Sequence, residues 1–150
     1  MARFRTNNDL GLAVLRVITG TIFVAHGAQK LFVYGFDGVA GGFASMGIPF
    51  PAIVGPMVGL LEFFGGLALI TGLLTRLAGT GLAINMLGAL LLVHLPAGFF
   101  MPNGYEFVML LGAGAITLTL SGAGRYSIDA LISRRRAPAA VQTRELRRAA

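Results

Sequence analysis

The chain has 150 residues, of which 55% are hydrophobic and only 12% are charged. Soluble domains carry about 25% charged residues, so this composition excludes a disordered chain and argues against a soluble domain. The chain contains no cysteine, which excludes disulfides, thiolate metal sites and thiol redox motifs. We therefore expect a membrane protein whose main partner is the lipid bilayer.

The net charge of +6 raises the question of nucleic-acid binding. Residues 133–150 hold six arginines and one glutamate, which sum to +5, so the hydrophobic body is nearly neutral. That body has no basic patch interleaved with aromatic side chains of the kind that nucleic-acid-binding proteins present. We expect no nucleic-acid partner.

Four apolar stretches follow one another along the chain, at about residues 10–33, 52–74, 77–95 and 105–121. Each has a length suited to about 30 Å of hydrocarbon at about 1.5 Å per residue. Spanning segments must be helices or closed barrels, and continuous apolar runs favour helices. The first stretch is too long for a signal peptide and contains Arg16. The sequence therefore predicts an all-α membrane protein, a bundle of four transmembrane helices.

The basic residues outside the tail predict the orientation of these spans. Arg3 and Arg5 precede the first span, Arg76 lies in the turn between the second and third, and Arg125 follows the fourth. Lys30, at the outer end of the first span, is the single exception. The loops 34–51 and 96–104 contain neither lysine nor arginine. The positive-inside bias therefore places both termini in the cytoplasm and these two loops on the outer side.

The flanking segments complete the predicted organisation. Residues 1–9 form a cytoplasmic arm, residues 10–132 form the membrane domain, and residues 133–150 form a disordered, arginine-rich tail that can touch anionic lipid. Within the loop 34–51, apolar residues recur at three- or four-residue steps. This spacing predicts a short helix in the outer interface, ended by the two prolines of the loop.

Several ionisable residues fall inside the predicted spans. Such groups cost about 2.5–3.5 kcal/mol on insertion scales, so they need partners or a wet cavity. Arg16 and Lys30 share one face of the first span with two glycines, and His26 flanks that face. Glu62 lies on a glycine-rich face of the second span, where another helix can approach closely. We expect the glycines to serve packing.

Depth along the helices suggests partners for Glu62. Counted from the cytoplasmic side, Glu62 lies between Arg16 and His26 and can pair with either, and Asn85 lies near the same level. Two interpretations stay open: a structural Arg16–Glu62 ion pair that fixes the packing of the helices, and a functional polar site.

The outer ends of the spans carry further polar residues. For Lys30 and Glu106 we expect the side chains to reach the membrane interface. His26 and His94 lie at similar outer depths, which raises the possibility of haem ligation. His94 follows Asn85 by nine residues, half a turn away on a regular helix, so it faces away if Asn85 faces inward. This argues against haem, and two histidines alone are too few for a metal site.

Three motifs occur in order along the chain. The first span, LRVITGTIFVAHGAQKLF, contains HGxxK, and the second, LLEFFGGLALITGLLTRLAG, contains ExxGG. The fourth span opens with NGYEF and is followed by GAGRYSIDALI, which contains GRYSxD. This ordered set resembles the DoxX family of small four-span bacterial membrane proteins over residues 10 to 132. The resemblance implies a four-helix bundle in the cytoplasmic membrane and a redox role. The family is named after a subunit of a thiosulfate:quinone oxidoreductase, and relatives are linked to oxidative stress or to enzymes that detoxify catechols and quinones.

A quinone-linked oxidoreductase subunit is therefore the first functional hypothesis. Quinone reduction consumes protons, so Glu62 and His26 are the candidate proton-handling residues. Arg16 and Lys30 would balance the charge, and Asn85 could donate to a quinone carbonyl. Because the chain has neither cysteine nor a flavin motif, a redox partner protein must supply the electrons.

Two alternatives come from other functional classes. The chain could be a scaffold that docks a redox enzyme through its arginine-rich tail or outer loops. It could also transport phenolic compounds, in which case four spans form a narrow bundle and a homo-oligomer is expected.

Overall fold

The computed structural model of the chain describes residues 2–136, and this part is built of helices without a strand. The elements in order are α1 (Ala2–Ala28), η1 (Gln29–Tyr34), α2 (Gly35–Ser45), α3 (Pro51–Thr71), α4 (Thr75–Ala89), η2 (Leu90–His94), η3 (Leu95–Ala97), α5 (Glu106–Ser121) and α6 (Ile128–Arg136). η1 and η2 are π-helical turns, and η3 is a 3₁₀ turn. The all-α prediction is confirmed.

Three helical stretches are long and apolar enough to cross a membrane: Asn7–Ser45, Pro51–Thr71 and Thr75–Ala97. α5 is a shorter apolar helix of 16 residues. All four predicted spans are therefore found as helices, but the first helix begins at Ala2, before the predicted start at residue 10, and its helical stretch continues to Ser45, past the predicted end at residue 33.

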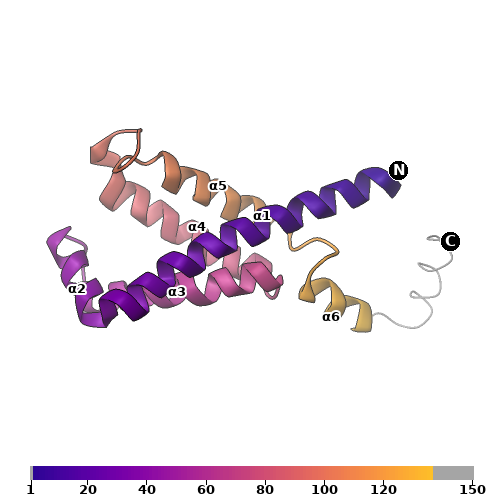
Figure 1. Cartoon of the computed structure of the whole chain (residues 1–150), viewed down its shortest axis with the longest axis horizontal. Coiled ribbons are helices and arrows are strands. Elements are labelled where there is room, and N and C mark those ends of the chain that lie inside the picture. The colour runs from indigo at the N-terminus through magenta and orange to yellow at the C-terminus, as the bar shows by residue number, and fades with distance from the viewer. Residues whose placement is uncertain (1, 137–150) are drawn as a thin grey trace.

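The four long helices pack in two pairs, α1 with α3 and α4 with α5 (Figure 1). α2 and the loop that precedes α5 lie at one end of the molecule, and α6 and the start of α1 lie at the other (Figure 1). This arrangement is the one that an antiparallel four-span chain requires. The orientation of the bundle across a membrane stays a prediction.

Glycines bring α1 and α3 close together, as the sequence predicted. A Cβ atom added at Gly20 would lie 2.7 Å from the carbonyl oxygen of Gly66, and one added at Gly66 would lie 2.7 Å from that of Gly20. Two turns further along α1, Gly27 lies against the backbone of Phe63. In lipid, where hydrophobic burial does not drive helix association, such close backbone contact is a main source of affinity between helices.

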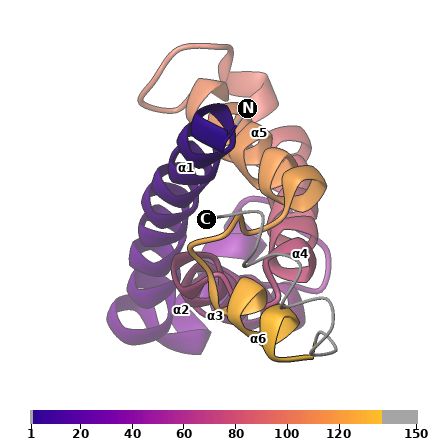
Figure 2. The ribbon, with the colours of Figure 1, turned by 90° about the vertical axis from the view of Figure 1, so that its right-hand side faces the viewer.

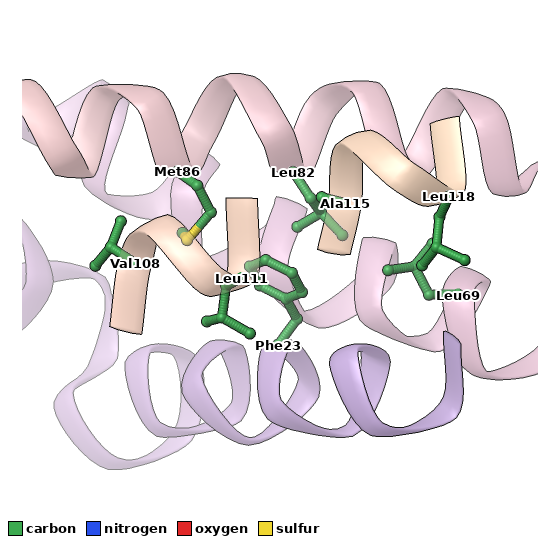
Figure 3. Close-up of a cluster of buried hydrophobic side chains, with 8 residues drawn as sticks. All are labelled: Phe23, Leu69, Leu82, Met86, Val108, Leu111, Ala115 and Leu118. Carbon is green, nitrogen blue, oxygen red and sulfur yellow. The ribbon is translucent and has the colours of Figure 1, made fainter. Parts of the chain in front are cut away.

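The core lies between the two pairs. Its buried side chains come from α1, α3, α4 and α5 (Figure 3), and they are Phe23, Leu69, Leu82, Met86, Val108, Leu111, Ala115 and Leu118. Large apolar side chains such as Ile84, Leu110 and Leu120 are exposed on the outer faces of the same helices. This outward apolar surface is what a helix needs to contact lipid.

The predicted helix in the loop 34–51 is present as α2, but its end differs from the prediction. α2 stops at Ser45, where Gly47 has a φ of 72° and the N–H of Ile48 donates to the carbonyl of Phe43 at 3.0 Å. A glycine in the left-handed region thus ends the helix before the first proline. The second proline, Pro51, instead begins α3.

Both flanking segments contain residues that are helical. α1 begins at Ala2, so most of the predicted arm is helical. α6 runs to Arg136, so the first residues of the predicted disordered tail, which begins at residue 133, form the end of a helix. The remainder of that predicted tail, residues 137–150, lies outside the described residues.

Candidate functional site

Glu62 is the centre of a buried polar cluster in the middle of α3. Its carboxylate accepts two hydrogen bonds, from Lys30 Nζ to Oε2 at 2.6 Å and from Asn85 Nδ2 to Oε1 at 3.1 Å. Only 6% of the Glu62 side chain is exposed, so the ammonium of Lys30 is needed to compensate its charge. The cluster therefore joins η1, α3 and α4.

Both partners predicted for Glu62 are wrong, because its counter-ion is Lys30 and neither Arg16 nor His26 bonds to it. The expectation that Lys30 reaches out to the membrane interface is also wrong. Its side chain is 21% exposed and turns inward to the carboxylate. Two local features allow this geometry. Lys30 lies in the π-helical turn η1, and Gly59, one turn from Glu62, leaves room for the start of the lysine side chain.

Arg16 belongs to a different part of the molecule. Its side chain is buried, and Nη2 donates to the backbone carbonyl of Tyr126 at 2.6 Å. Its guanidinium also lies against Gly72 at the end of α3. Arg16 therefore holds the segment between α5 and α6 on the end of the bundle and takes no part in the Glu62 cluster.

A cavity of about 700 Å³ opens from the Glu62 cluster towards the end of the molecule that carries α2. Five of its lining residues are polar or charged within the spans, namely His26, Lys30, Glu62, Asn85 and His94. Its walls are mainly apolar, with Phe23, Val58, Met86, Phe107 and Leu111 among them. Residues from α2, the segment after it and the loop 98–104 also line it, and these include Phe43, Met46, Ile48, Met101 and Pro102. A concave, mostly apolar site with a few convergent polar groups is the usual form of a small-molecule site.

His94 also lines this cavity, which corrects the prediction that it faces away from Asn85. The prediction assumed a regular helix, but η2 is a π-helical turn that ends at His94 and changes the angular register. His94 Nδ1 lies 2.9 Å from the carbonyl oxygen of Asn103, so Nδ1 is the protonated nitrogen that donates this bond. The geometric argument against haem thus rested on a wrong premise. Within residues 2–136, no group of three or more histidine, cysteine, aspartate or glutamate side chains could hold a metal ion.

His26 lines the cavity from α1, close to the ring of Phe107 on α5. The two ring centroids are 6.1 Å apart. No described residue forms a hydrogen bond with the His26 ring, so both ring nitrogens are available to a ligand. His26 therefore gives the cavity a second polar group, separate from the Lys30–Glu62 pair.

Together these groups define what the cavity can bind. Apolar and aromatic walls suit a flat, apolar ring. The ammonium of Lys30 can donate to a ligand oxygen, and the carboxylate of Glu62 has lone pairs that can accept from a ligand hydroxyl. The Lys30–Glu62 pair has no net charge, so the cavity suits a neutral ligand that carries carbonyl or hydroxyl groups.

The comparisons with known proteins agree on one family. The model of the DoxX family matches residues 11–95. A Bacillus subtilis protein named "Putative oxidoreductase CatD" is 32% identical over 124 residues, which cover 83% of this chain and 88% of that protein. The Mycobacterium tuberculosis membrane protein Rv3486 is 35% identical over 81% of this chain and 80% of its own length. The Escherichia coli inner membrane protein YqjF is 32% identical over 85% of this chain and 95% of its own length. No solved structure matches the chain.

Proposed function

The chain belongs to the DoxX family of membrane proteins, and from this premise we propose that it is the quinone-binding subunit of a membrane oxidoreductase. The observation that carries the proposal is the cavity, whose apolar walls end on the Lys30–Glu62–Asn85 cluster. A quinone head group has the shape and chemistry that such a cavity accepts. Its ring is flat and apolar, its carbonyl oxygens accept hydrogen bonds, and the hydroxyls of its reduced form donate them.

The residues of the cluster differ in the roles that we assign to them. Lys30 donates a hydrogen bond to a carbonyl oxygen of the quinone, and Glu62 accepts one from a hydroxyl of the quinol. Asn85 orients the Glu62 carboxylate through the bond to Oε1. His26 provides a second proton-handling group on the wall of the cavity. Arg16 has no part in this site, because it is bonded to the segment beyond α5.

The reaction needs proton-handling side chains, which this chain contains, and an electron donor, which must come from another protein. Reduction of one quinone takes two electrons and two protons and gives one quinol. Protons reach the oxygens through Glu62 and His26, which exchange them with water. The chain has no cysteine that could carry electrons as a disulfide, so a redox partner protein supplies both electrons. The name of the Bacillus relative supports an oxidoreductase role of this kind.

Binding can be tested before any reaction is known. The detergent-purified protein is extracted with organic solvent, and the extract is analysed by mass spectrometry for quinone and haem. The protein is then titrated with a short-chain ubiquinone. We expect near-equimolar quinone and saturable binding, and about a tenfold weaker affinity in Glu62→Gln, the size of one lost charge-assisted hydrogen bond.

Glu106→Gln is the matched control, because Glu106 lies outside the cavity lining and glutamine can still accept the hydrogen bond from the backbone N–H of the lining residue Met101. Its affinity should equal that of the unmodified chain. Equal affinity of Glu62→Gln and the unmodified chain would remove Glu62 from the binding site. Haem in the extract in place of quinone would overturn the quinone assignment.

We further propose that the chain lies in the cytoplasmic membrane with both termini on the cytoplasmic side. The arginine distribution and the inner-membrane name of the Escherichia coli relative support this. Because the chain has no cysteine, single substitutions report the orientation directly. In intact cells, a membrane-impermeant maleimide should label Ser45→Cys and leave Ser133→Cys unlabelled. The reverse pattern would mean the opposite orientation.

A further inference from the structure

We propose that the cleft beside Arg76, at the end of the bundle opposite α2, binds the phosphate of an anionic lipid headgroup. This cleft has a volume of about 670 Å³ and is separate from the cavity at Glu62. It is formed by the turn between α3 and α4, the loop that leaves α5, and α6. Figure 2 shows this loop crossing the end of the bundle to reach α6. The proposal does not depend on the quinone function.

Arg76 supplies a cation that is free to bind a ligand. Its side chain lines the cleft and is exposed, and within residues 2–136 its guanidinium has no hydrogen bond or ion pair. The guanidinium lies over Gly122, where an added Cβ atom would be 3.4 Å from Nε and 3.5 Å from Nη2. The guanidinium therefore lies beside the space that a side chain at position 122 would occupy.

The acidic residue of the cleft does not neutralise this cation. Asp129 is turned towards the start of α4, where its two carboxylate oxygens accept the backbone N–H groups of Leu74 at 2.8 Å and Thr75 at 3.0 Å. The other polar side chains of the cleft include the hydroxyls of Ser121 and Ser133, which can donate to a phosphate oxygen. The cleft therefore combines one uncompensated guanidinium with neutral donors, a combination that suits a phosphate.

The surroundings of the cleft favour a lipid over a soluble phosphate. Leu74 and Leu77 line it and are 60% and 70% exposed, on the turn that carries Arg76. Long apolar side chains next to a free guanidinium match a phospholipid, whose acyl chains contact leucine while its phosphate meets arginine. The predicted orientation places this end at the cytoplasmic leaflet, where anionic lipids attract basic groups.

Native mass spectrometry of the full, detergent-purified chain tests the site. The protein is incubated with equal concentrations of dioleoyl-phosphatidylglycerol and dioleoyl-phosphatidylcholine. We expect about fivefold more bound phosphatidylglycerol, the ratio that corresponds to about 1 kcal/mol per basic residue near an anionic surface. Arg76→Gln should abolish this preference, and Arg76→Lys, which keeps the charge, should retain most of it.

Arg125→Gln is the matched control. It removes the same charge from the same end of the molecule, but Arg125 lies over the ring of Tyr126 and outside the cleft lining. The lipid preference should survive this change. An equal loss in both glutamine variants would overturn the proposal, because the preference would then come from the overall charge of this end. An unchanged preference in Arg76→Gln would overturn it too.

A competition experiment distinguishes a lipid ligand from a free phosphate ion. Inorganic phosphate at millimolar concentration is compared with sodium chloride of equal ionic strength. Bound phosphatidylglycerol should be the same in both, because the acyl chains add affinity that a free ion lacks. Displacement by phosphate alone would overturn the lipid assignment and identify a soluble phosphate ligand.

Discussion

The ammonium of Lys30 and the carboxylate of Glu62 meet at 2.6 Å, and this pair connects the π-helical turn after α1 to the middle of α3. The two side chains are unequally buried, at 21% and 6% exposure. This difference matters for the energetics. The lysine can turn towards the open cavity if its partner is lost, whereas the carboxylate cannot leave its buried position.

We therefore predict that Lys30→Met destabilises the protein more than Glu62→Gln does. Loss of one partner of a fully buried pair costs about 3–5 kcal/mol. Because Lys30 is partly exposed, we expect about 2–3 kcal/mol for Lys30→Met and about 1 kcal/mol for Glu62→Gln. The free energy of unfolding in detergent micelles, from denaturant titration, measures both.

The double variant gives the sharper test of this asymmetry. Lys30→Met combined with Glu62→Gln has no unpaired buried charge, so it should be more stable than Lys30→Met alone. Additive losses in the double variant would show that the two side chains are not energetically coupled.

Gly72→Ala should destabilise the end of the bundle through contact with Arg16. Gly72 has a φ of 70°, and a Cβ atom there would overlap the buried guanidinium of Arg16 and lie 2.5 Å from the Cβ of Ser127. Gly47 is the matched control, with a φ of 72° and nothing within 4 Å of an added Cβ atom. Gly47→Ala should cost about 1–2 kcal/mol from backbone strain alone. Gly72→Ala should cost about 1–3 kcal/mol more because of overpacking. Equal losses in the two variants would mean that both Arg16 and Ser127 move away from the added methyl group without measurable cost.

Gly20→Ala should weaken the contact between α1 and α3. An added Cβ atom there would lie 2.7 Å from a backbone oxygen of Gly66 and 2.8 Å from Cγ1 of Ile70. We expect a loss of about 1–3 kcal/mol in the free energy of unfolding. Gly11, on the same helix, has nothing within 4 Å of an added Cβ atom, so Gly11→Ala should gain up to about 1 kcal/mol from helix propensity. A gain in both variants would contradict the close approach of the two helices.

The helices could be predicted from the sequence because lipid constrains the chain so strongly. Every span must satisfy its own backbone, so length and hydropathy locate it. The polar partners could not be predicted in the same way. The partner of Glu62 was inferred from depth along regular helices, and the direction of His94 from uniform helical rotation, but η1 and η2 are π-helical turns. Such a turn shifts the residues that follow it, and no feature of the local sequence marks its position.

The cavity walls and α6 were missed for related reasons. Phe107 and Leu111 both line the cavity. The sequence cannot identify them, because an apolar residue in an apolar span has the same pattern whether it faces a cavity or lipid. The segment of α6 is rich in arginine and was expected to be disordered from residue 133 onwards. Its attachment depends on contacts with Gly72 and Leu74, more than 50 residues away in the sequence. Only the folded chain brings them together.

Those distant contacts of α6 lead to the last prediction. Asp129, in the first turn of α6, accepts the backbone N–H groups of Leu74 and Thr75 at the start of α4 and donates its own N–H to the carbonyl of Gly72. Its carboxylate thus acts as a helix cap supplied by a remote segment, in favourable interaction with the dipole of α4. Asp129→Ala should cost about 1–2 kcal/mol and increase amide hydrogen exchange in α6 and in the first turn of α4. Asp129→Asn keeps one acceptor oxygen, so its loss of stability should fall between those of the unmodified chain and Asp129→Ala.

Asp37→Ala is the control. It removes an acidic residue from the first turn of α2, where the side chain has no hydrogen bond within residues 2–136. It should change hydrogen exchange neither in α6 nor in the first turn of α4. Faster exchange in α6 without any change at the start of α4 would show that Asp129 only stabilises its own helix and does not cap α4.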